Sequence, residues 1–272
     1  MSERSHRPYS FSRQMPGDQK NPVVTAKDIM LPEVTTSRCI TWLQRGWRDL
    51  SRQPGIGIAH GVVMAIFGAV LFTFAHDRFW LLAGAFSGFL LVAPVLATGL
   101  YAISRALEQG GEANVGTVIK VWRSGDGRMI RFGLLLALAG TGWVLTSAAM
   151  VTLWAPQPIN GPADFLKHVV IADSWVFEAW GVLGGLLAAP VFASSVIAMP
   201  MLLDRPVTVL TAVLTSWRVV MTNPLPMAAW AGVIMLLAAL GMATALLGLI
   251  VIMPLLGHAS WHAYRDLVRD AA

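Results

Sequence analysis

Charged residues are scarce in this chain. Asp, Glu, Lys and Arg make up 13% of the 272 residues, whereas a soluble globular domain carries about 25%. Because so few charges cannot cover a water-exposed surface, and 56% of the residues are hydrophobic, we expect much of the surface to contact lipid. The composition therefore excludes an ordinary soluble domain and predicts an integral membrane protein.

Cysteine and a leader-like segment are also lacking. Cys39 is the single cysteine, so an intrachain disulfide is excluded and the thiol is expected to be inert. Residues 1–30 contain no apolar core of the signal-peptide kind, so the first membrane helix is expected to act as its own insertion signal. Residues 1–35 are predicted to be a mostly disordered cytoplasmic tail, followed by a membrane domain over 36–272.

Recognisable catalytic motifs are missing too. The sequence contains no glycine-rich phosphate loop, no Gly-x-Ser-x-Gly elbow, no His-Glu-x-x-His zinc motif and no pair of carboxylates within a hydrophobic run. We therefore expect a protein that is not an enzyme and that needs no cofactor.

Long hydrophobic runs are what the sequence has instead. A helix needs about 20 apolar residues to cross the hydrocarbon layer of a bilayer. Four runs of this kind predict transmembrane helices at 56–75, 79–101, 132–154 and 175–203.

The last apolar run, 225–264, is too long for one span. A single helix of that length would overshoot the bilayer by about 30 Å, at about 1.5 Å per residue. Two helices over 225–241 and 245–264, joined by a tight turn near 241–244, fit the bilayer better. The sequence thus predicts an all-α polytopic protein with six transmembrane helices.

The 20 Lys and Arg residues predict the orientation. With six spans, the tail, the loops 102–131 and 204–224 and the C-terminus lie on one side, and only Arg78 and Lys167 fall opposite. Because basic residues in short loops stay in the cytoplasm, both termini are predicted to be cytoplasmic. The basic residues on that face are expected to contact anionic lipid headgroups, so the pI of 9.9 does not require nucleic acid as a partner.

A Trp-Arg pair occurs three times, each time ahead of an apolar run. Apolar residues stand four and seven positions before each Trp, which is the spacing of one helical stripe. We interpret the chain as three units, each a short amphipathic helix on the inner leaflet followed by a transmembrane hairpin, although repeated lipid-facing composition would give a similar pattern. The expected interfacial anchors are Trp47, Arg48, Trp122, Arg123, Trp217, Arg218, Trp261 and Arg265.

Proline and small residues recur within the spans. Pro94, Pro190 and Pro254 follow Gly-led aliphatic runs, where each frees a backbone carbonyl and either only bends its helix or opens a polar notch toward a central feature. Small residues at four-residue spacing indicate close helix packing, within a compact bundle or across a dimer. They are Gly84, Gly88, Gly181, Gly185 and Ala189.

Few ionisable side chains lie in the spans. Glu178 stands one turn into the fourth span, either at the water boundary or as a proton or cation site. His258 and His262 share one helix face, and His60 lies at a similar depth. These histidines are candidates for interfacial anchoring, for binding a metal or haem, or for proton-linked gating.

The chain resembles the DUF2189 family of bacterial integral membrane proteins, which has no established function. The segments that carry the resemblance are "TWLQRGWRDL" at 41–50, "GFLLVAPVLATGLYAISRALEQG" at 88–110, "AMPMLLDRPVTVLTAVLTSWRVVMTNPLPM" at 198–227 and "GLIVIMPLLGHASWHAYRDLV" at 248–268. The resemblance implies a six-span protein of the bacterial inner membrane.

Three functions remain open at this point. The favoured one is a scaffold, an accessory subunit or a lipid-interacting protein, with a membrane-protein partner or a second copy of the chain. The second is a small transporter or channel that uses the proline notches and Glu178. The third is a haem- or copper-binding accessory of a respiratory oxidase, through His258 and His262.

Overall fold

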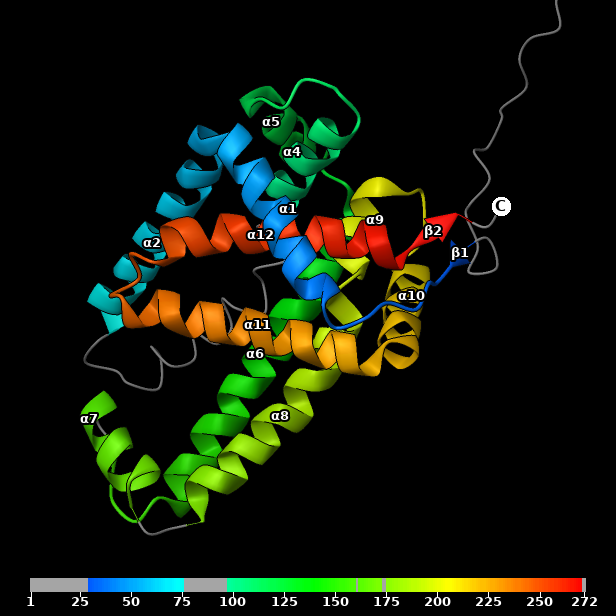
Figure 1. The fold of residues 1–272 in the computed structure, drawn as a ribbon. Coiled ribbons are helices and arrows are strands. Elements are labelled where there is room, and N and C mark those ends of the chain that lie inside the picture. Colours follow the sequence, from blue (N-terminus) through cyan, green and yellow to red (C-terminus); the bar gives the residue numbers. More distant parts are fainter. Residues whose placement is uncertain (1–28, 76–96, 160, 173–174, 271–272) are drawn as a thin grey trace, which may run out of the picture.

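The computed structural model describes residues 29–75, 97–159, 161–172 and 175–270 (Figure 1). Almost all of this part of the chain is helical, which confirms the predicted all-α class. The exception is a two-residue antiparallel ladder between β1 (Ile29–Met30) and β2 (Arg269–Asp270), which joins the two ends of the described chain.

Helices make up most of the described ranges. In chain order they are α1 (Arg38–Arg52), α2 (Pro54–Ala75), α4 (Thr98–Glu108), α5 (Val115–Arg123), α6 (Gly127–Trp154), α7 (Pro162–Phe165), the π-helical turn η2 (Leu166–Val170), α8 (Val176–Ser195), α9 (Ala198–Asp204), α10 (Val209–Thr222), α11 (Pro224–Ala243) and α12 (Leu249–Leu267).

Each segment with the predicted apolar stripe forms a short helix that leads into a long apolar one. These pairs are α1 and α2, α5 and α6, and α10 and α11. Local capping defines two of the short helices: Asn114 Oδ1 accepts the Thr117 amide proton ahead of α5, and Thr208 Oγ1 accepts that of Thr211 in α10, both at 3.1 Å. The three amphipathic helices are confirmed as elements, and the threefold repeat stays a prediction.

Within the described residues, three helical stretches are long and apolar enough to cross a membrane: Gly127–Trp154, Val176–Asp204 and Pro224–Ala243. A fourth would be the stretch Arg38–Arg52 with Pro54–Val70, which is bent by 104°. Six transmembrane helices are therefore not shown. Most of the predicted span 79–101 lies outside the described residues, and its last four residues begin α4.

The predicted span 175–203 is broken in two. Helix α8 ends at Ser195 and α9 begins at Ala198, and the Ile197 amide donates to Ser216 Oγ at 3.2 Å. A proline ring clashes with the carbonyl four positions earlier in a helix, so Pro200 accounts for the break at Val196. By contrast, α8 continues through Pro190.

The run 225–264 forms two helices, as predicted, with the turn a few residues later than expected. Ala245 and Leu246 have φ of 50° and 70° in this turn. The Thr244 hydroxyl donates to Gly241 O and accepts the Gly248 amide proton, both at 2.8 Å. Helices α11 and α12 consequently lie side by side in opposite directions (Figure 1).

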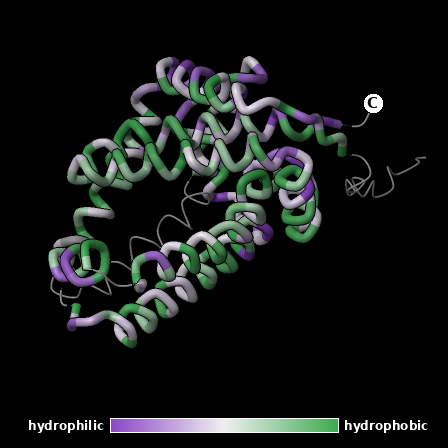
Figure 2. The backbone as a smooth tube through the Cα atoms, turned by 60° about the horizontal axis from the view of Figure 1, so that its bottom comes forward, coloured by the Kyte–Doolittle hydropathy of each residue, from purple (hydrophilic) through white to green (hydrophobic). Residues whose placement is uncertain are grey.

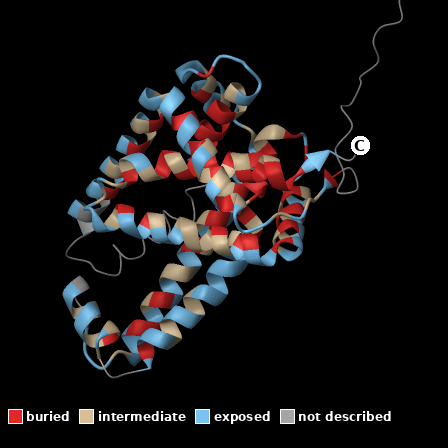
Figure 3. Cartoon of the chain, viewed as in Figure 1, coloured by how far each residue is buried: buried red, intermediate tan, exposed pale blue. Residues whose placement is uncertain are grey.

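Helix α12 lies at the centre of the molecule. It packs closely against α1 and α2 (Figure 3), and its second half is almost entirely buried. Gly46 of α1 allows this approach, because a Cβ there would lie 2.7 Å from Ala259 N and 2.9 Å from Leu255 O. Next to this contact, the buried indoles of Trp42 and Trp230 meet edge-on with centroids 5.4 Å apart.

The outward surfaces of the long helices are apolar (Figure 2). Aliphatic side chains on α2, α6, α8 and α11 are more than half exposed, among them Val63, Ile66, Leu134, Leu138, Leu186, Met235 and Leu236. Water would not tolerate so much exposed aliphatic surface, whereas the hydrocarbon of a bilayer matches it.

Part of the predicted disordered tail is ordered. Residues 1–28 lie outside the described part, but 29–35 pack against the end of α10. The Val34 amide donates to Asn223 Oδ1 at 2.8 Å, and Asn223 Nδ2 donates to Pro32 O at 3.2 Å. Ile29 is buried beside the C-terminal residues.

Candidate functional site

The polar side chains of the fold gather where α1, α2, α4 and α12 meet. We call one group, formed by Asp49, His60, Ser104, His258 and His262, the histidine cluster. Electrostatic coupling links His258 to His60, His262 and Asp49, so the three predicted histidines do come together. The i, i+4 spacing in α12 places both of its imidazoles on the side facing α1 and α4.

The two histidines of α12 have different partners. His258 is fully buried and its Nδ1 is hydrogen-bonded to Ser104 Oγ at 2.8 Å. His262 Nε2 lies 2.8 Å from Asp49 Oδ2. Because an ionised carboxylate only accepts hydrogen bonds, this contact fixes the proton of His262 on Nε2.

Within the described residues, two buried imidazole nitrogens of the cluster have no hydrogen-bond partner. His60 Nδ1 contacts Ile56 O at 2.9 Å, while the Nε2 atoms of His60 and His258 are buried and make no hydrogen bond within the described residues. Gly99 lies against His60, and a Cβ at that position would come within 2.7 Å of its Nε2. The described chain thus leaves two buried nitrogens unsatisfied at one helix junction.

Asp49 carries the negative charge of the cluster. Burial alone would raise the pKa of its carboxyl, but hydrogen bonds from His262 and Ser104 and the nearby imidazoles hold that pKa below its usual value. The carboxylate is therefore ionised at neutral pH, and it holds α1 to α12 through His262.

The haem or copper prediction finds little geometric support. Within the described ranges, no group of three or more His, Cys, Asp or Glu side chains is arranged to hold a metal ion. In the two histidines of α12, His258 Nδ1 is already hydrogen-bonded to Ser104 and His262 Nε2 to Asp49.

A second polar group ties α4, α9 and α12 together. Glu108 accepts hydrogen bonds from Trp261 Nε1 and Arg265 Nε, both at 3.0 Å. Asp204, at the end of α9, accepts the Tyr264 hydroxyl proton at 2.7 Å and forms an ion pair with Arg105 at 3.1 Å. Arg105 and Arg265 share Asp204 as an ion-pair partner.

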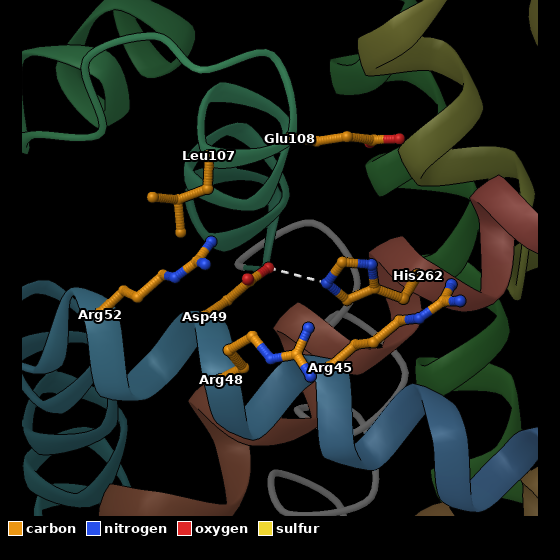
Figure 4. A pocket seen from close by; sticks show the side chains of 7 residues that line it. All are labelled: Arg45, Arg48, Asp49, Arg52, Leu107, Glu108 and His262. Atoms are coloured by element: carbon orange, nitrogen blue, oxygen red, sulfur yellow. Dashed lines mark hydrogen bonds and ion pairs between the residues drawn. The ribbon is translucent and has the colours of Figure 1, made fainter.

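A pocket of about 240 Å³ lies beside the Asp49–His262 pair of the histidine cluster (Figure 4). We call it the arginine pocket; it is lined by Arg45, Arg48, Asp49, Arg52, Leu107, Glu108 and His262. The three arginines extend from α1, while Leu107 and Glu108 close the opposite wall from the end of α4 (Figure 4). The Asp49–His262 pair links α1 to α12 across the pocket.

The predicted anchors fall into two groups. Trp47 and Trp122 are 55% and 57% exposed, and the arginines that follow them are exposed as well. Trp217 is half-buried, and its Nε1 donates to Ser194 Oγ at 2.9 Å. Trp261 is buried, so it packs within the fold and is not free to anchor it at an interface.

The predicted prolines do not share one location. Pro190 is exposed on α8, whereas Pro254 is buried against α2 beside Gly57, and Pro94 lies outside the described residues. Glu178 is exposed in the first turn of α8. A negative charge there is favoured by the helix dipole. The described residues Pro190, Pro254 and Glu178 thus lie in different surroundings, and the pathway through the prolines stays a prediction.

The predicted glycine stripe has no partner helix within the described part. Gly181, Gly185 and Ala189 are exposed on α8, while Gly84 and Gly88 lie outside the described residues. Gly184 makes the close contact instead, with its Cβ position 3.0 Å from Trp143.

Comparison with known proteins identifies the membrane region. Residues 81–204 match a family model described as "Predicted integral membrane protein (DUF2189)". This stretch of the chain is similar to the DUF2189 family, as the sequence motifs suggested. No curated protein matches the chain, and no solved structure does. The DUF2189 region ends at Asp204 and does not include α1 or α12, which supply most of the histidine cluster and the arginine pocket.

Several residues of the site were missed from the sequence. They are the acidic and hydroxyl partners of the basic and aromatic side chains: Asp49, Ser104, Glu108, Asp204 and Asp266. The sequence does contain a signal that could have identified the four carboxylates. Acidic residues are few in this chain, and Asp49, Glu108, Asp204 and Asp266 all lie on the predicted cytoplasmic side.

Proposed function

We propose that this protein is a non-enzymatic six-span protein of the bacterial inner membrane, acting as a scaffold or accessory subunit that engages anionic lipids through α1, α5 and α10. The family match supports a multi-pass membrane protein. The finer statements rest on how exposed apolar and basic side chains are distributed over the three short helices.

The observation that carries the proposal is an unburied apolar position on each short helix. Ile40, Val115 and Leu210, seven positions before each Trp, are 62%, 59% and 66% exposed. An arginine follows each Trp and is exposed in all three helices. Exposed apolar side chains next to exposed arginines suit the boundary between acyl chains and phosphates.

The six-span topology has independent support. The bend of 104° between α1 and α2 allows α1 to lie along the membrane plane while α2 crosses it. Helices α2, α6 and α11 lead away from the end of the molecule that carries the short helices, and α8 and α12 return to it (Figure 1). The paired β1 and β2 strands lie at this same end, so both termini are expected on one side of the membrane.

Single-cysteine labelling tests the topology. In a Cys39→Ala background, Gln157→Cys reports on the loop between α6 and α8, and Arg269→Cys reports on the C-terminal strand; both native residues are exposed. We expect a membrane-impermeant maleimide to label only Gln157→Cys in intact spheroplasts and both variants after lysis. Labelling of Arg269→Cys in intact spheroplasts would contradict the six-span proposal.

Purification in mild detergent tests the scaffold role. We expect a reproducible membrane-protein partner or a defined oligomer, identified by mass spectrometry and by mass measurement of the complex. A lone monomer recovered under several mild conditions would contradict this part of the proposal without affecting the topology.

A further inference from the structure

The carboxylates of the arginine pocket are already engaged by other side chains. Asp49 is hydrogen-bonded to His262 at 2.8 Å, and Glu108 is bonded to Arg265 at 3.0 Å. Arg265 offsets the negative charge of Glu108, so Asp49 is the one carboxylate of the pocket that faces the three arginines without a paired arginine. The remaining electrostatic balance of the pocket is therefore positive.

Two of the three arginines lack a partner. Arg45 forms an ion pair with Asp266 at 3.2 Å. Within the part of the chain that the structure describes, Arg48 and Arg52 make no hydrogen bond or ion pair, and both are exposed. Their guanidinium groups stand one helical turn apart on α1, so one ligand can contact both.

Arg45 and Arg52 face away from the apolar stripe of α1, and Arg48 lies between that stripe and the pocket. Because successive residues turn by about 100°, Ile40 and Trp47 fall on one flank of the helix, and the pocket arginines fall roughly 90–150° around it. If the stripe rests on lipid, as the proposed function requires, the pocket opens toward water. The direction of the opening favours a water-soluble ligand over a lipid headgroup.

We propose that the arginine pocket binds the phosphoryl group of a small soluble anion. Arg48 and Arg52 supply forked N–H donors that match the oxygens of phosphate, and charge-assisted hydrogen bonds of this kind are strong. The pocket volume of about 240 Å³ corresponds to roughly eight water molecules, which accommodates a phosphate and a short polar extension. The inference rests on the proposed function only for the side from which the ligand arrives.

Calorimetric titration of inorganic phosphate into the full chain in phosphatidylcholine nanodiscs tests this site, with chloride at matched ionic strength as the reference. We expect saturable binding that Arg48→Gln/Arg52→Gln weakens at least tenfold and that Arg48→Lys/Arg52→Lys weakens less. The matched control is Arg269→Gln, which removes an exposed arginine on β2 outside the pocket and leaves binding unchanged. Because the two pocket arginines are exposed and unpaired, melting without phosphate should be the same in every variant.

A second arm distinguishes the source of the phosphoryl group. Thermal stability is compared between nanodiscs of phosphatidylcholine alone and nanodiscs that also contain phosphatidic acid. Stabilisation by phosphatidic acid alone, lost in Arg48→Gln/Arg52→Gln, would keep the phosphoryl site and assign it to a lipid. If neither phosphate nor phosphatidic acid separates the wild type from this double variant, the proposal is overturned, and the labelling result for topology is unaffected.

Discussion

The Trp42 indole donates a 2.9 Å hydrogen bond to Asp266 Oδ2, across 224 positions of sequence. Two arginines of the same helix, Arg38 and Arg45, lie 3.4 and 3.2 Å from the two oxygens of this carboxylate. One acidic side chain of α12 thereby satisfies a buried indole and two cations of α1. This contact and the close approach at Gly46 together explain why α1 lies flat against the central helix.

Replacing Asp266 with Leu should weaken the fold. The change leaves the Trp42 N–H buried without an acceptor and removes the partner of two half-exposed arginines, so we expect a loss of about 2 kcal/mol. Thermal unfolding of the purified protein in a fixed detergent measures this as a lower Tm. Glu33→Leu is the control, since Glu33 is exposed and makes no ion pair within the described residues; equal losses in both variants would argue against the Trp42 contact.

Gly46→Ala should also destabilise the protein. The added methyl group would lie 2.7 Å from the Ala259 backbone nitrogen, and because backbone atoms cannot move independently, α1 must shift away from α12. Overpacking of this kind costs about 1–3 kcal/mol. Gly55→Ala meets nothing within 4 Å and serves as the matched control. If Gly46→Ala has the same Tm as the wild type, α1 and α12 are packed less tightly at Gly46 than the structure indicates.

The local elements were largely predictable from the sequence, and their partners were not. Periodicity alone predicts α1, α5 and α10, and run length alone predicts the turn between α11 and α12. The break at Val196 was also predictable, because Pro200 stands four positions later. A hydropathy window does not register one proline, so the run appeared continuous.

The site shows where local reasoning fails. Trp261 and Arg265 have the composition of an aromatic and basic belt, yet Trp261 is buried and both bind Glu108. The same side chains suit a lipid interface and a buried polar junction. Only the long-range position of α4 beside α12 distinguishes the two environments, and no periodicity in the sequence encodes that position.

Stability should depend on pH through Asp49. The folded pKa of this carboxyl lies below its unfolded value of about 3.9, so its contribution is present above about pH 4 and is lost as pH falls through the folded pKa. Asp49→Asn should therefore lower the Tm at neutral pH and flatten the acid side of the stability profile. Melting scans from neutral to acid pH measure this. A variant profile that runs parallel to the wild type would exclude Asp49 as the titrating group.

Ser104→Ala should destabilise the protein by about 1–3 kcal/mol, because it leaves the buried Nδ1 of His258 without its 2.8 Å partner. Ser104→Thr retains the hydroxyl and is expected to recover part of the loss. Chemical unfolding of both variants in the same detergent gives the comparison. Equal unfolding of the Ala variant and the wild type would mean that His258 finds another partner.

Trp47 and Trp122 should report the depth of α1 and α5 in the membrane. Both indoles are more than half exposed, and the proposed function places them at the headgroup boundary, so lipids brominated near the top of the acyl chain should quench them. Replacing both with Phe is expected to lower the quenched fraction of the Trp fluorescence. Trp261→Phe is the control, because its buried indole lies beyond the reach of a lipid bromine. If the quenched fraction falls only when Trp261 is replaced, the two short helices lie away from the bilayer, and lipid engagement through α1 and α5 is wrong even if the six-span topology is right.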